Sequence, residues 1–316
     1  MLVGSCWPLS SSIKVLILLA TRNGGRFLSE QLASYRAQTH ANWELLVSDD
    51  GSTDGTVPLL QDFASSVQQR VVICQGPQLG FWQNFVSLVR GGDRDAELFA
   101  FSDQDDIWHP QKLERAVAWF ATVAGDTPAL YFTRTELIKE DGSPTGFSPL
   151  FRQPPGFQNA LVQNIGGGNT MVFNRAARAL LIATPDDASI VSHDWWAYQV
   201  ISGCGGATHY DPWPSVQYRQ HQANLVGSNV GWRARLLRLS AFANGRVVGW
   251  NNVNLAVLAQ LRHLLTPANA KALDSFAAAR AAALPRRLWL VWKSGAYRQS
   301  AIENVGLFLG ALFGRL

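Results

Sequence analysis

The sequence contains little cysteine and little charge, and both shortages narrow the classes of protein to which it can belong. Its three cysteines, Cys6, Cys74 and Cys204, lie far apart and form no C-x-x-C pair. The sequence therefore predicts neither a disulfide framework nor a thiolate zinc site, and a reducing cytosol suits it best. Charged residues make up 16% of the 316 residues and hydrophobic ones 47%, a composition typical of a globular protein and not of a disordered chain.

Long hydrophobic runs are also missing. The longest apolar stretches are residues 15–20 and 305–314, and both are shorter than the roughly 18 residues that a bilayer-spanning helix requires. The first 20 residues carry no basic segment ahead of their apolar run, which argues against a secretory signal peptide. We therefore expect a cytoplasmic protein in which no segment crosses a membrane.

Acidic and basic residues are unevenly distributed. Residues 232–316 contain twelve Lys or Arg and two acidic residues, whereas the preceding part contains fifteen basic and twenty-one acidic ones. Strand patterns also disappear after about residue 230, so we expect a main domain at residues 1–230 and a basic, mostly helical extension at residues 231–316. The acidic main domain would repel nucleic acid, and we expect no nucleic-acid partner.

Two stretches of the extension, residues 232–239 and 286–293, mix arginine with aliphatic residues at helical spacing, and the second also contains two tryptophans. Such stretches suit the surface of an anionic membrane, where basic residues meet lipid headgroups and tryptophan settles at the interface. The alternative is a pair of helices that packs on the main domain and leaves a basic face in solvent.

The N-terminal half alternates between strand and helix patterns. Apolar runs of strand length, rich in branched residues, occur at residues 13–20, 43–48, 71–74 and 98–102. Apolar residues recur at helical spacing between them, and such repeated units with short connections predict an α/β fold with a doubly wound, mostly parallel sheet. Residues 144–168 are rich in Pro, Gly and Gln without a clear period, and we expect them to form an insertion that lines a site.

Acidic residues cluster at two of the predicted strand ends. Residues 49–56 (DDGSTDGT) follow the second strand, and residues 102–106 (SDQDD) follow the strand at 98–102. Ligands of open α/β sheets bind outside the carboxyl ends of the strands, where both clusters would lie. Either cluster alone could be a turn that caps the next helix. Together, and without cysteine, they favour Mg²⁺ or Mn²⁺ bound with the phosphates of a nucleoside diphosphate.

Longer runs of sequence carry a specific resemblance. The runs VLILLATRNGGRFLSEQLAS, WELLVSDDGSTDGT and FAFSDQDDIWHPQKLE resemble the inverting family 2 glycosyltransferases of the GT-A fold. The form SDQDDIW, with GGGNTMVFN and YRQHQANLVG downstream, is most similar to the bacterial rhamnosyltransferases that build cell-surface polysaccharide. The match covers about residues 13–228. It implies a GT-A catalytic domain with a Rossmann-like sheet, followed by a helical extension that matches no pattern.

The resemblance implies a donor site at the strand ends. Asp50, or its neighbour Asp49, would bind the imide N–H of a pyrimidine base, and Arg219 would pair with phosphate oxygens. The other residues expected to contact the nucleotide sugar are Thr21, Arg22, Asn23, Asp103 and Gln104. Mg²⁺ or Mn²⁺ would be held by the D-x-D pair, with Asp105 the more direct ligand, and by a downstream histidine; these ligands are Asp103, Asp105 and His221.

The resemblance also implies an acceptor side of the site. Asp194 would be the general base that removes the proton of the acceptor hydroxyl as its oxygen attacks the anomeric carbon; the alternative for this residue is a helix N-cap. The position before it is usually Glu in the family and is His193 here, which leaves the role of His193 open. The residues expected near the donor sugar and the acceptor are Gly167, Gly168, Asn169, His193, Trp195 and Trp196.

These assignments predict an inverting glycosyltransferase. The implied donor is dTDP-L-rhamnose, and the implied acceptor is a hydroxyl of a lipopolysaccharide or other lipid-linked glycan at the cytoplasmic face of the cell membrane. Two alternatives stay open: a sugar-phosphate nucleotidyltransferase, whose glycine-rich N-terminal signature residues 21–26 match poorly, and a non-catalytic subunit that binds nucleotide sugars. The presence of Asp194 argues against the second.

Overall fold

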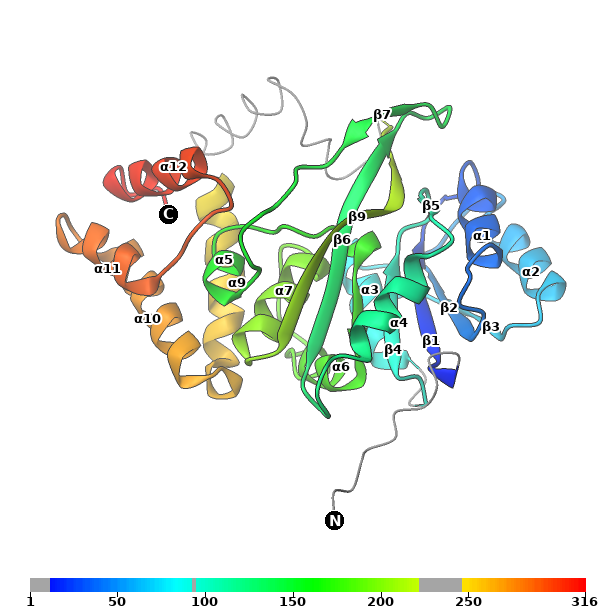
Figure 1. Ribbon diagram of the computed structural model, residues 1–316, viewed down its shortest axis with the longest axis horizontal. Helices are drawn as coiled ribbons and strands as arrows, with labels where there is room; N and C mark the ends of the chain where they lie inside the picture. Colours follow the sequence, from blue (N-terminus) through cyan, green and yellow to red (C-terminus); the bar gives the residue numbers. More distant parts are fainter. Residues whose placement is uncertain (1–11, 93–94, 222–245) are drawn as a thin grey trace, which may run out of the picture.

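The computed structural model describes residues 12–92, 95–221 and 246–316. In this part of the chain a nine-stranded sheet has the order β3-β2-β1-β4-β8-β6-β9-β5, and β7 pairs with β6 off this path (Figure 1). The strands are β1 (Val15–Thr21), β2 (Trp43–Asp49), β3 (Val71–Gln75), β4 (Leu98–Ser102), β5 (Ile107–Trp108), β6 (Ala129–Ile138), β7 (Pro144–Phe147), β8 (Val172–Asn174) and β9 (Ala207–Arg219). Most paired residues belong to parallel ladders, so the predicted α/β fold with a mostly parallel sheet is confirmed.

Helices cover both faces of the N-terminal half of the sheet. They are α1 (Leu28–Arg36), α2 (Thr56–Ser66), α3 (Phe81–Gly91) and α4 (Lys112–Phe120). Alternate side chains of β1 enter two different hydrophobic clusters, because Leu16 and Leu18 pack on the side of α3 whereas Ile17 and Leu19 pack on the side of α1. A strand that is covered on both faces needs an unbroken apolar sequence, and this explains the run of apolar residues in β1.

The second half of the sheet carries the elements that complete the candidate site. These are α5 (Phe157–Ala160), η2 (Gly168–Thr170), α6 (Arg175–Ile182) and α7 (His193–Gly203). α7 is buried along its length except at Asp194, which is partly exposed. β9 pairs with β6 in parallel and ends at Arg219, next to the loop that follows β4.

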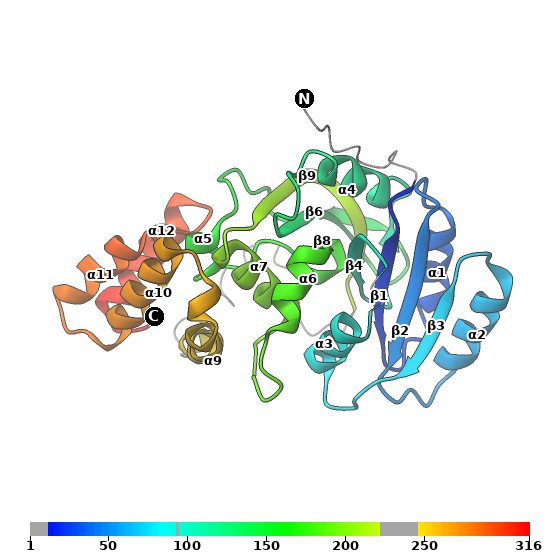
Figure 2. The ribbon, with the colours of Figure 1, turned by 90° about the horizontal axis from the view of Figure 1, so that it is seen from below.

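The described part of the predicted extension is helical. It contains α9 (Arg246–Gln260), η3 (Arg262–Leu264), α10 (Pro267–Ala281), α11 (Arg286–Ser294) and α12 (Ala301–Leu312). Leu258, Phe276 and Val291 share a hydrophobic cluster with Tyr198 of α7, so these helices pack on the sheet domain. Figures 1 and 2 show them at the end of the molecule opposite α1 and α2.

Two expectations about the extension concern residues that lie outside the described ranges. The domain boundary near residue 230 and the basic stretch at residues 232–239 both lie outside them, so the division into residues 1–230 and 231–316 stays a prediction. Within the three described ranges, every helix is too short or too polar to cross a bilayer.

Candidate active site

The carboxyl ends of β1 and β2 bring Thr21 beside the first aspartate pair. Thr21 Oγ1 donates a 2.8 Å hydrogen bond to Asp49 Oδ2. Ser52 donates to the same carboxylate twice, from its backbone N–H to Oδ1 at 2.8 Å and from its hydroxyl to Oδ2 at 2.5 Å. Both oxygens of Asp49 therefore accept hydrogen bonds within the protein, and this side chain fixes the turn that follows β2.

Asp50 is held differently from its neighbour. Its side chain is buried, and Oδ1 accepts a 2.5 Å hydrogen bond from the backbone N–H of Gln78, a residue with a positive φ of 57°. The structure gives no partner for the second oxygen of Asp50 among the described residues. Asp50 therefore has a carboxylate oxygen that can still accept a hydrogen bond, whereas both oxygens of Asp49 already accept hydrogen bonds within the protein.

Gly76 supports this arrangement, although the sequence alone did not single it out. A Cβ atom at Gly76 would lie 2.8 Å from Asp50 Oδ1, 2.9 Å from Asn84 Oδ1 and 3.0 Å from the carbonyl oxygen of Asp49. Only glycine fits there, because two of these three neighbours are buried side chains and the third is backbone. The signal in the sequence is faint: a glycine two residues after the strand predicted at 71–74.

Gly76→Ala is expected to displace Asp50 and to destabilise the protein by about 1–3 kcal/mol, the usual range for overpacking. It should also lower the affinity for dTDP, the nucleotide that the resemblance implies. Thermal unfolding with and without dTDP measures both effects. Gly55→Ala is the matched control, since no atom lies within 4 Å of a Cβ atom at Gly55. Equal losses in the two variants would contradict this role of Gly76.

Gln104 ties the loop after β1 to the loop after β4. Its Oε1 accepts a 2.8 Å hydrogen bond from the backbone N–H of Arg22, and its Nε2 donates to the carbonyl of Arg22 at 3.0 Å. Asn23, with a positive φ of 50°, bonds in turn to Ser52 and Thr53 in the turn after β2. The structure thus brings Arg22, Asn23 and Gln104 together around the strand ends, with the Gln104 amide acting as a brace between loops.

The D-x-D loop after β4 brings the carboxyl groups of Asp103, Asp105 and Asp106 close together. Burial, and then the charges of Asp105 and Asp194, raise the pKa of Asp103 to about 8. Burial also raises the pKa of Asp106 well above its usual value, with Asp105 and Asp103 adding to the effect. The carboxylates of the D-x-D loop and Asp194 therefore lie in one electrostatic site, and a cation would offset their mutual repulsion.

The predicted metal ligands are brought together only in part. His221 Nε2 lies 2.7 Å from Asp105 Oδ2, but no set of three or more His, Cys, Asp or Glu side chains in the described ranges is arranged to hold a metal. One carboxylate and one imidazole suit Mn²⁺ or Mg²⁺ when phosphate oxygens or water supply the other ligands. The donors present therefore fit a cation that is shared with a bound diphosphate.

A buried network supports the D-x-D loop from behind. Asp106 Oδ2 accepts a 2.5 Å hydrogen bond from Asn169 Nδ2, and Asp106 Oδ1 accepts one of 3.1 Å from the backbone N–H of Arg219. Lys112 Nζ donates to the carbonyl of Asn169 at 2.9 Å. This network ties the glycine loop, residues 166–169, to the D-x-D loop. Asp106 belongs to the acidic cluster at residues 102–106 but was not expected to bind a ligand, and Lys112 was not among the residues predicted from the sequence.

Arg219 is almost completely buried, with 1% of its surface exposed. Its guanidinium donates to the carbonyls of Asp105 (3.1 Å) and Glu140 (2.7 Å) and to the Glu30 carboxylate (2.8 Å), and it stacks 4.7 Å from the centre of the Phe27 ring. The side chain therefore fixes the backbone of the D-x-D loop. Its predicted contact with phosphate stays a prediction.

Asp194 lies in the first turn of α7 and not at the N-cap, which is Ser192. Asp194 Oδ2 accepts a 3.0 Å hydrogen bond from Asn164 Nδ2, and Oδ1 accepts one of 2.7 Å from the backbone N–H of Trp195. The carboxylate is partly exposed at the end of an otherwise buried helix. It is thus oriented by two fixed donors and open on one side, as a base that receives a proton from a bound substrate must be.

His193 is buried in an aromatic box. Its ring stacks on Phe85 with centroids 3.7 Å apart and meets the edge of Phe101 at 4.8 Å, and neither ring nitrogen has a hydrogen-bond partner among the described residues. Burial lowers the pKa of His193 to about 4, against the opposing charge of Asp194. A neutral ring fits between two phenylalanines where a carboxylate would not, which accounts physically for histidine at a position that is usually Glu.

Other residues predicted on the acceptor side, namely Gly168, Trp195 and Trp196, pack closely against their neighbours in the structure. A Cβ atom at Gly168 would lie 2.3 Å from His193 Nε2, so the glycine loop lies directly against the histidine. Trp195 and Trp196 are both buried, and their indole N–H groups donate to the carbonyl of Ala160 (2.7 Å) and to Thr184 Oγ1 (2.8 Å). The structure therefore places both tryptophans in the core under Asp194.

Comparisons with known proteins agree with this geometry. The sequence model described as glycosyl transferase family 2 matches residues 16–181. The dTDP-rhamnosyl transferase RfbG of Shigella flexneri is 28% identical over 240 residues, which cover 72% of this chain and 79% of that protein. The resemblance to family 2 glycosyltransferases and bacterial rhamnosyltransferases is thereby confirmed.

Two groups of solved structures share the fold. TarS 1–349 of S. aureus in complex with UDP-GlcNAc superposes with a TM-score of 0.54 at 14% identity, covering 90% of this chain and 93% of that chain. The mannosyltransferase PcManGT from Pyrobaculum calidifontis, in complex with GDP-Man and Mn²⁺, gives a TM-score of 0.51 at 18% identity, covering 93% and 88%. These neighbours establish the GT-A fold for the chain.

Proposed function

Since the chain belongs to glycosyl transferase family 2, we propose that it transfers L-rhamnose from dTDP-L-rhamnose, with inversion, to a hydroxyl of a cell-surface glycan. One set of observations supports the proposal: Gln104 and Asn23 join the D-x-D loop to the turns after β1 and β2, and the charge of Asp194 acts on Asp103. The chain that carries them is similar to a dTDP-rhamnosyl transferase over 240 residues. The acceptor in this proposal is a lipopolysaccharide or another lipid-linked saccharide, and the reaction takes place in the cytoplasm.

The chain's own residues supply recognition and proton transfer. Asp50 accepts a hydrogen bond from the imide N–H of thymine, because its second oxygen has no other partner among the described residues. Asp194 accepts the proton of the acceptor hydroxyl as that oxygen attacks the anomeric carbon from the face opposite the diphosphate. Asn164 and the N–H of Trp195 hold the carboxylate in place during this step.

Asp105 and His221 would hold Mg²⁺ or Mn²⁺ together with the diphosphate. The pKa of Asp103 is raised in the same loop, and a bound cation would favour the charged form of this carboxyl. When bound, the cation supplies positive charge that stabilises the departing diphosphate. Arg219 and the Asp106–Asn169 pair keep the backbone of this loop in position before the donor binds.

A thermal-shift screen of nucleotide sugars tests the proposed donor. With Mn²⁺ present, dTDP-L-rhamnose is expected to raise the unfolding temperature more than UDP-GlcNAc or GDP-mannose does, since a ligand at 100 times its dissociation constant adds about 2.7 kcal/mol of stability. Omission of Mn²⁺ should reduce the shift. A larger shift with UDP-GlcNAc or GDP-mannose would contradict dTDP-L-rhamnose as the donor, but it would still agree with a glycosyltransferase.

A further inference from the structure

We propose that the outer face of α11 and α12 is a docking surface for an anionic lipid membrane. This inference does not depend on the identity of the donor or the acceptor. It arises from exposed residues that the donor and acceptor sites do not use.

The exposed side of α12 is made of apolar residues, as is usual for the interior of a protein. Every exposed residue of this helix is apolar, namely Ala301, Ile302, Val305, Phe308, Leu309 and Leu312. Ile302 is 85% exposed and Val305 is 60% exposed. A helix on the surface of a globular domain normally exposes polar residues to solvent. The exposed side of α12 is therefore suited to contact with an apolar environment.

α11 extends the same feature with aromatic and basic residues. Its inner side buries Leu290 and Val291, whereas Trp289 and Trp292 are 51% and 71% exposed. Lys293 Nζ lies 4.7 Å from the centre of the Trp289 ring. Exposed tryptophan beside lysine is typical of helices that lie in the interface of a bilayer.

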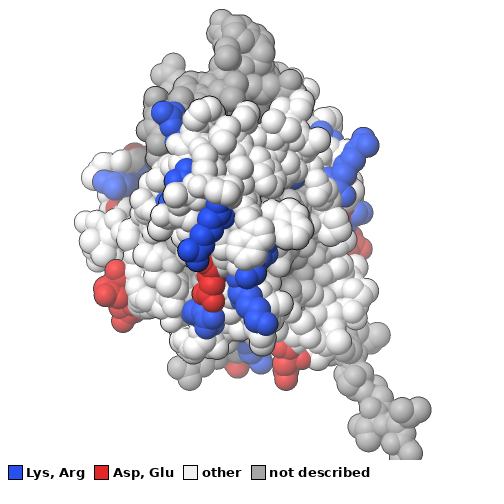
Figure 3. All heavy atoms as spheres, turned by 90° about the vertical axis from the view of Figure 1, so that its left-hand side faces the viewer, with Lys and Arg blue, Asp and Glu red and all other residues white. Residues whose placement is uncertain are grey.

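The two helices form one continuous end of the molecule. A groove of about 620 Å³ runs between them, lined by Leu288 of α11 and by residues of α12. Figure 3 views this end and shows a broad uncharged area with lysine and arginine side chains beside it. Both helices are far too short to cross a bilayer, so the face would lie on the membrane and not span it.

The excess of basic residues in this part of the chain favours an anionic partner. Residues 246–316 contain nine basic and two acidic residues, and both acidic side chains are paired with arginine. Asp274 lies 2.6 Å from Arg262, and Glu303 lies 3.7 Å from Arg298. In a symmetric dimer the same patch would face itself, and like charges would meet. Anionic headgroups instead complement the basic residues, while the acyl region accepts the apolar ones.

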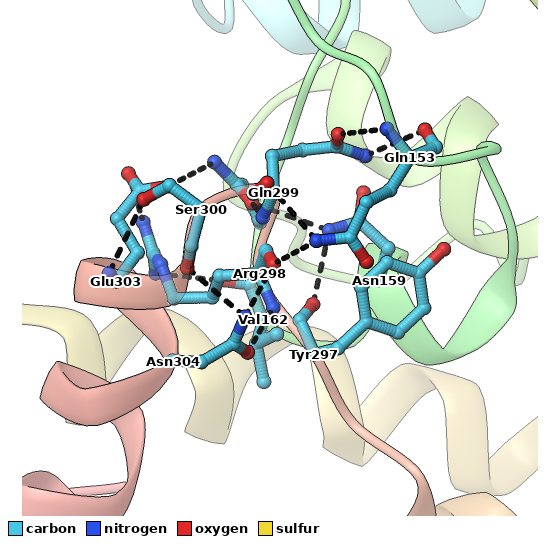
Figure 4. Close-up of polar contacts among 10 residues, drawn as sticks. Gln153, Asn159, Val162, Tyr297, Arg298, Gln299, Ser300, Glu303 and Asn304 are labelled. Carbon is cyan, nitrogen blue, oxygen red and sulfur yellow. Dashed lines mark hydrogen bonds and ion pairs between the residues drawn. The ribbon is translucent and has the colours of Figure 1, made fainter.

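The connection between α11 and α12 fixes this face relative to Asp194. Arg298 Nη1 donates to the carbonyl of Val162 at 2.9 Å, and the backbone N–H of Gln299 donates to Gln163 Oε1 at 2.9 Å. Gln299 and Gln153 are also joined by three hydrogen bonds of 3.0 Å (Figure 4). Residue 164, next along the chain, holds the Asp194 carboxylate. A protein docked through α11 and α12 would therefore hold its acceptor side at a fixed position over the membrane.

Co-sedimentation of the full chain with vesicles tests the proposal. The protein is expected to bind vesicles of phosphatidylglycerol and phosphatidylcholine at low ionic strength, and to bind phosphatidylcholine vesicles much less. Replacing Trp292, Ile302 and Phe313 together by Ser should reduce the affinity for the anionic vesicles more than tenfold. These side chains are 71%, 85% and 70% exposed, so the unfolding temperature and its shift with dTDP should remain as in the unmodified protein.

A control variant replaces three exposed apolar residues elsewhere on the surface by Ser. Phe147, Leu150 and Ile182 are 46%, 44% and 39% exposed and lie outside α11 and α12; their joint replacement by Ser should leave vesicle binding unchanged. The proposal is overturned if the intact protein fails to bind anionic vesicles, or if both triple variants bind equally well. Sedimentation velocity tests the alternative that a second copy of the chain binds this face. That alternative would hold if the intact protein is a dimer, does not bind vesicles, and becomes a monomer only in the variant with changes at α11 and α12.

Discussion

Replacement of Asp194 by Asn is expected to lower kcat by a factor of about 100 or more, because it keeps the shape of the side chain but removes the basic oxygen that takes the proton. The affinity for dTDP should change little, since the nucleotide meets Asp50 and the D-x-D loop. The measurement is single-turnover transfer to the natural acceptor, or hydrolysis of the donor if no acceptor is at hand, alongside a dTDP titration.

The fold should survive this substitution. Asn retains an acceptor for the N–H of Trp195, and loss of one negative charge in the first turn of α7 costs about 0.3–1 kcal/mol. Asn164→Ala removes the other partner of Asp194 without removing the base, and it should reduce kcat far less. Asp126→Asn is the matched carboxylate-to-amide control at an exposed position. Turnover near that of the unmodified protein would remove Asp194 as the base.

The same experiment separates the proposed function from the two alternatives that the sequence left open. A subunit that only binds nucleotide sugars would show neither transfer nor donor hydrolysis before the substitution. A nucleotidyltransferase would form its product from a sugar phosphate and a nucleoside triphosphate, with no acceptor hydroxyl for Asp194 to deprotonate. Dependence of glycosyl transfer on Asp194, with unchanged dTDP binding, is expected only of a glycosyltransferase.

The parallel strands could be predicted because burial on both faces leaves a strong pattern in the sequence. The runs at 43–48, 71–74 and 98–102 appear as β2, β3 and β4 with bounds that differ by at most one residue. The strand expected at 13–20 begins at Val15 and ends at Thr21. In each case the apolar run is short and ends in glycine, aspartate or another turn-forming residue.

β9 could not be predicted in the same way. It contains Pro212 and Pro214, which normally argue against a strand inside a sheet. The register of β9 against β6 shifts between Thr133 and Arg134, so that Asp211 and Pro214 pair with neighbouring residues of β6. A bulge of this kind accommodates proline because it removes residues from the ladder, and only the partner strand reveals it.

The sequence indicates which residues lie at the strand ends more readily than it indicates which hydrogen bonds they form. Spacing places Asp49 and Asp50 at the same strand end, and only the hydrogen bonds from Thr21 and Ser52 distinguish them. Likewise Arg219 has the charge to bind phosphate, but its partners in the structure are the D-x-D loop and Glu30. Long-range hydrogen bonds leave no periodic signal, so such distinctions need the folded chain.

Replacement of Asp105 by Ala is expected to abolish the gain in dTDP affinity that Mn²⁺ provides, a loss of tenfold or more, or at least about 1.4 kcal/mol. The fold should be retained. Arg219 holds the main-chain carbonyl of Asp105, which alanine keeps, and the carboxylate itself is 20% exposed with His221 as its partner. Calorimetric titration of dTDP with and without Mn²⁺ measures the effect.

The control for this prediction is Asp62→Ala, which removes an exposed carboxylate from α2 and should leave the metal dependence of dTDP binding unchanged. His221→Ala should weaken the metal dependence in the same direction as Asp105→Ala, because the two side chains lie 2.7 Å apart and would share the cation. If the Asp105 variant still binds dTDP more tightly with Mn²⁺ than without it, to the same degree as the unmodified protein, Asp105 is not a required ligand. The cation would then have to be held by Asp103, the other carboxyl of the D-x-D pair, and the diphosphate.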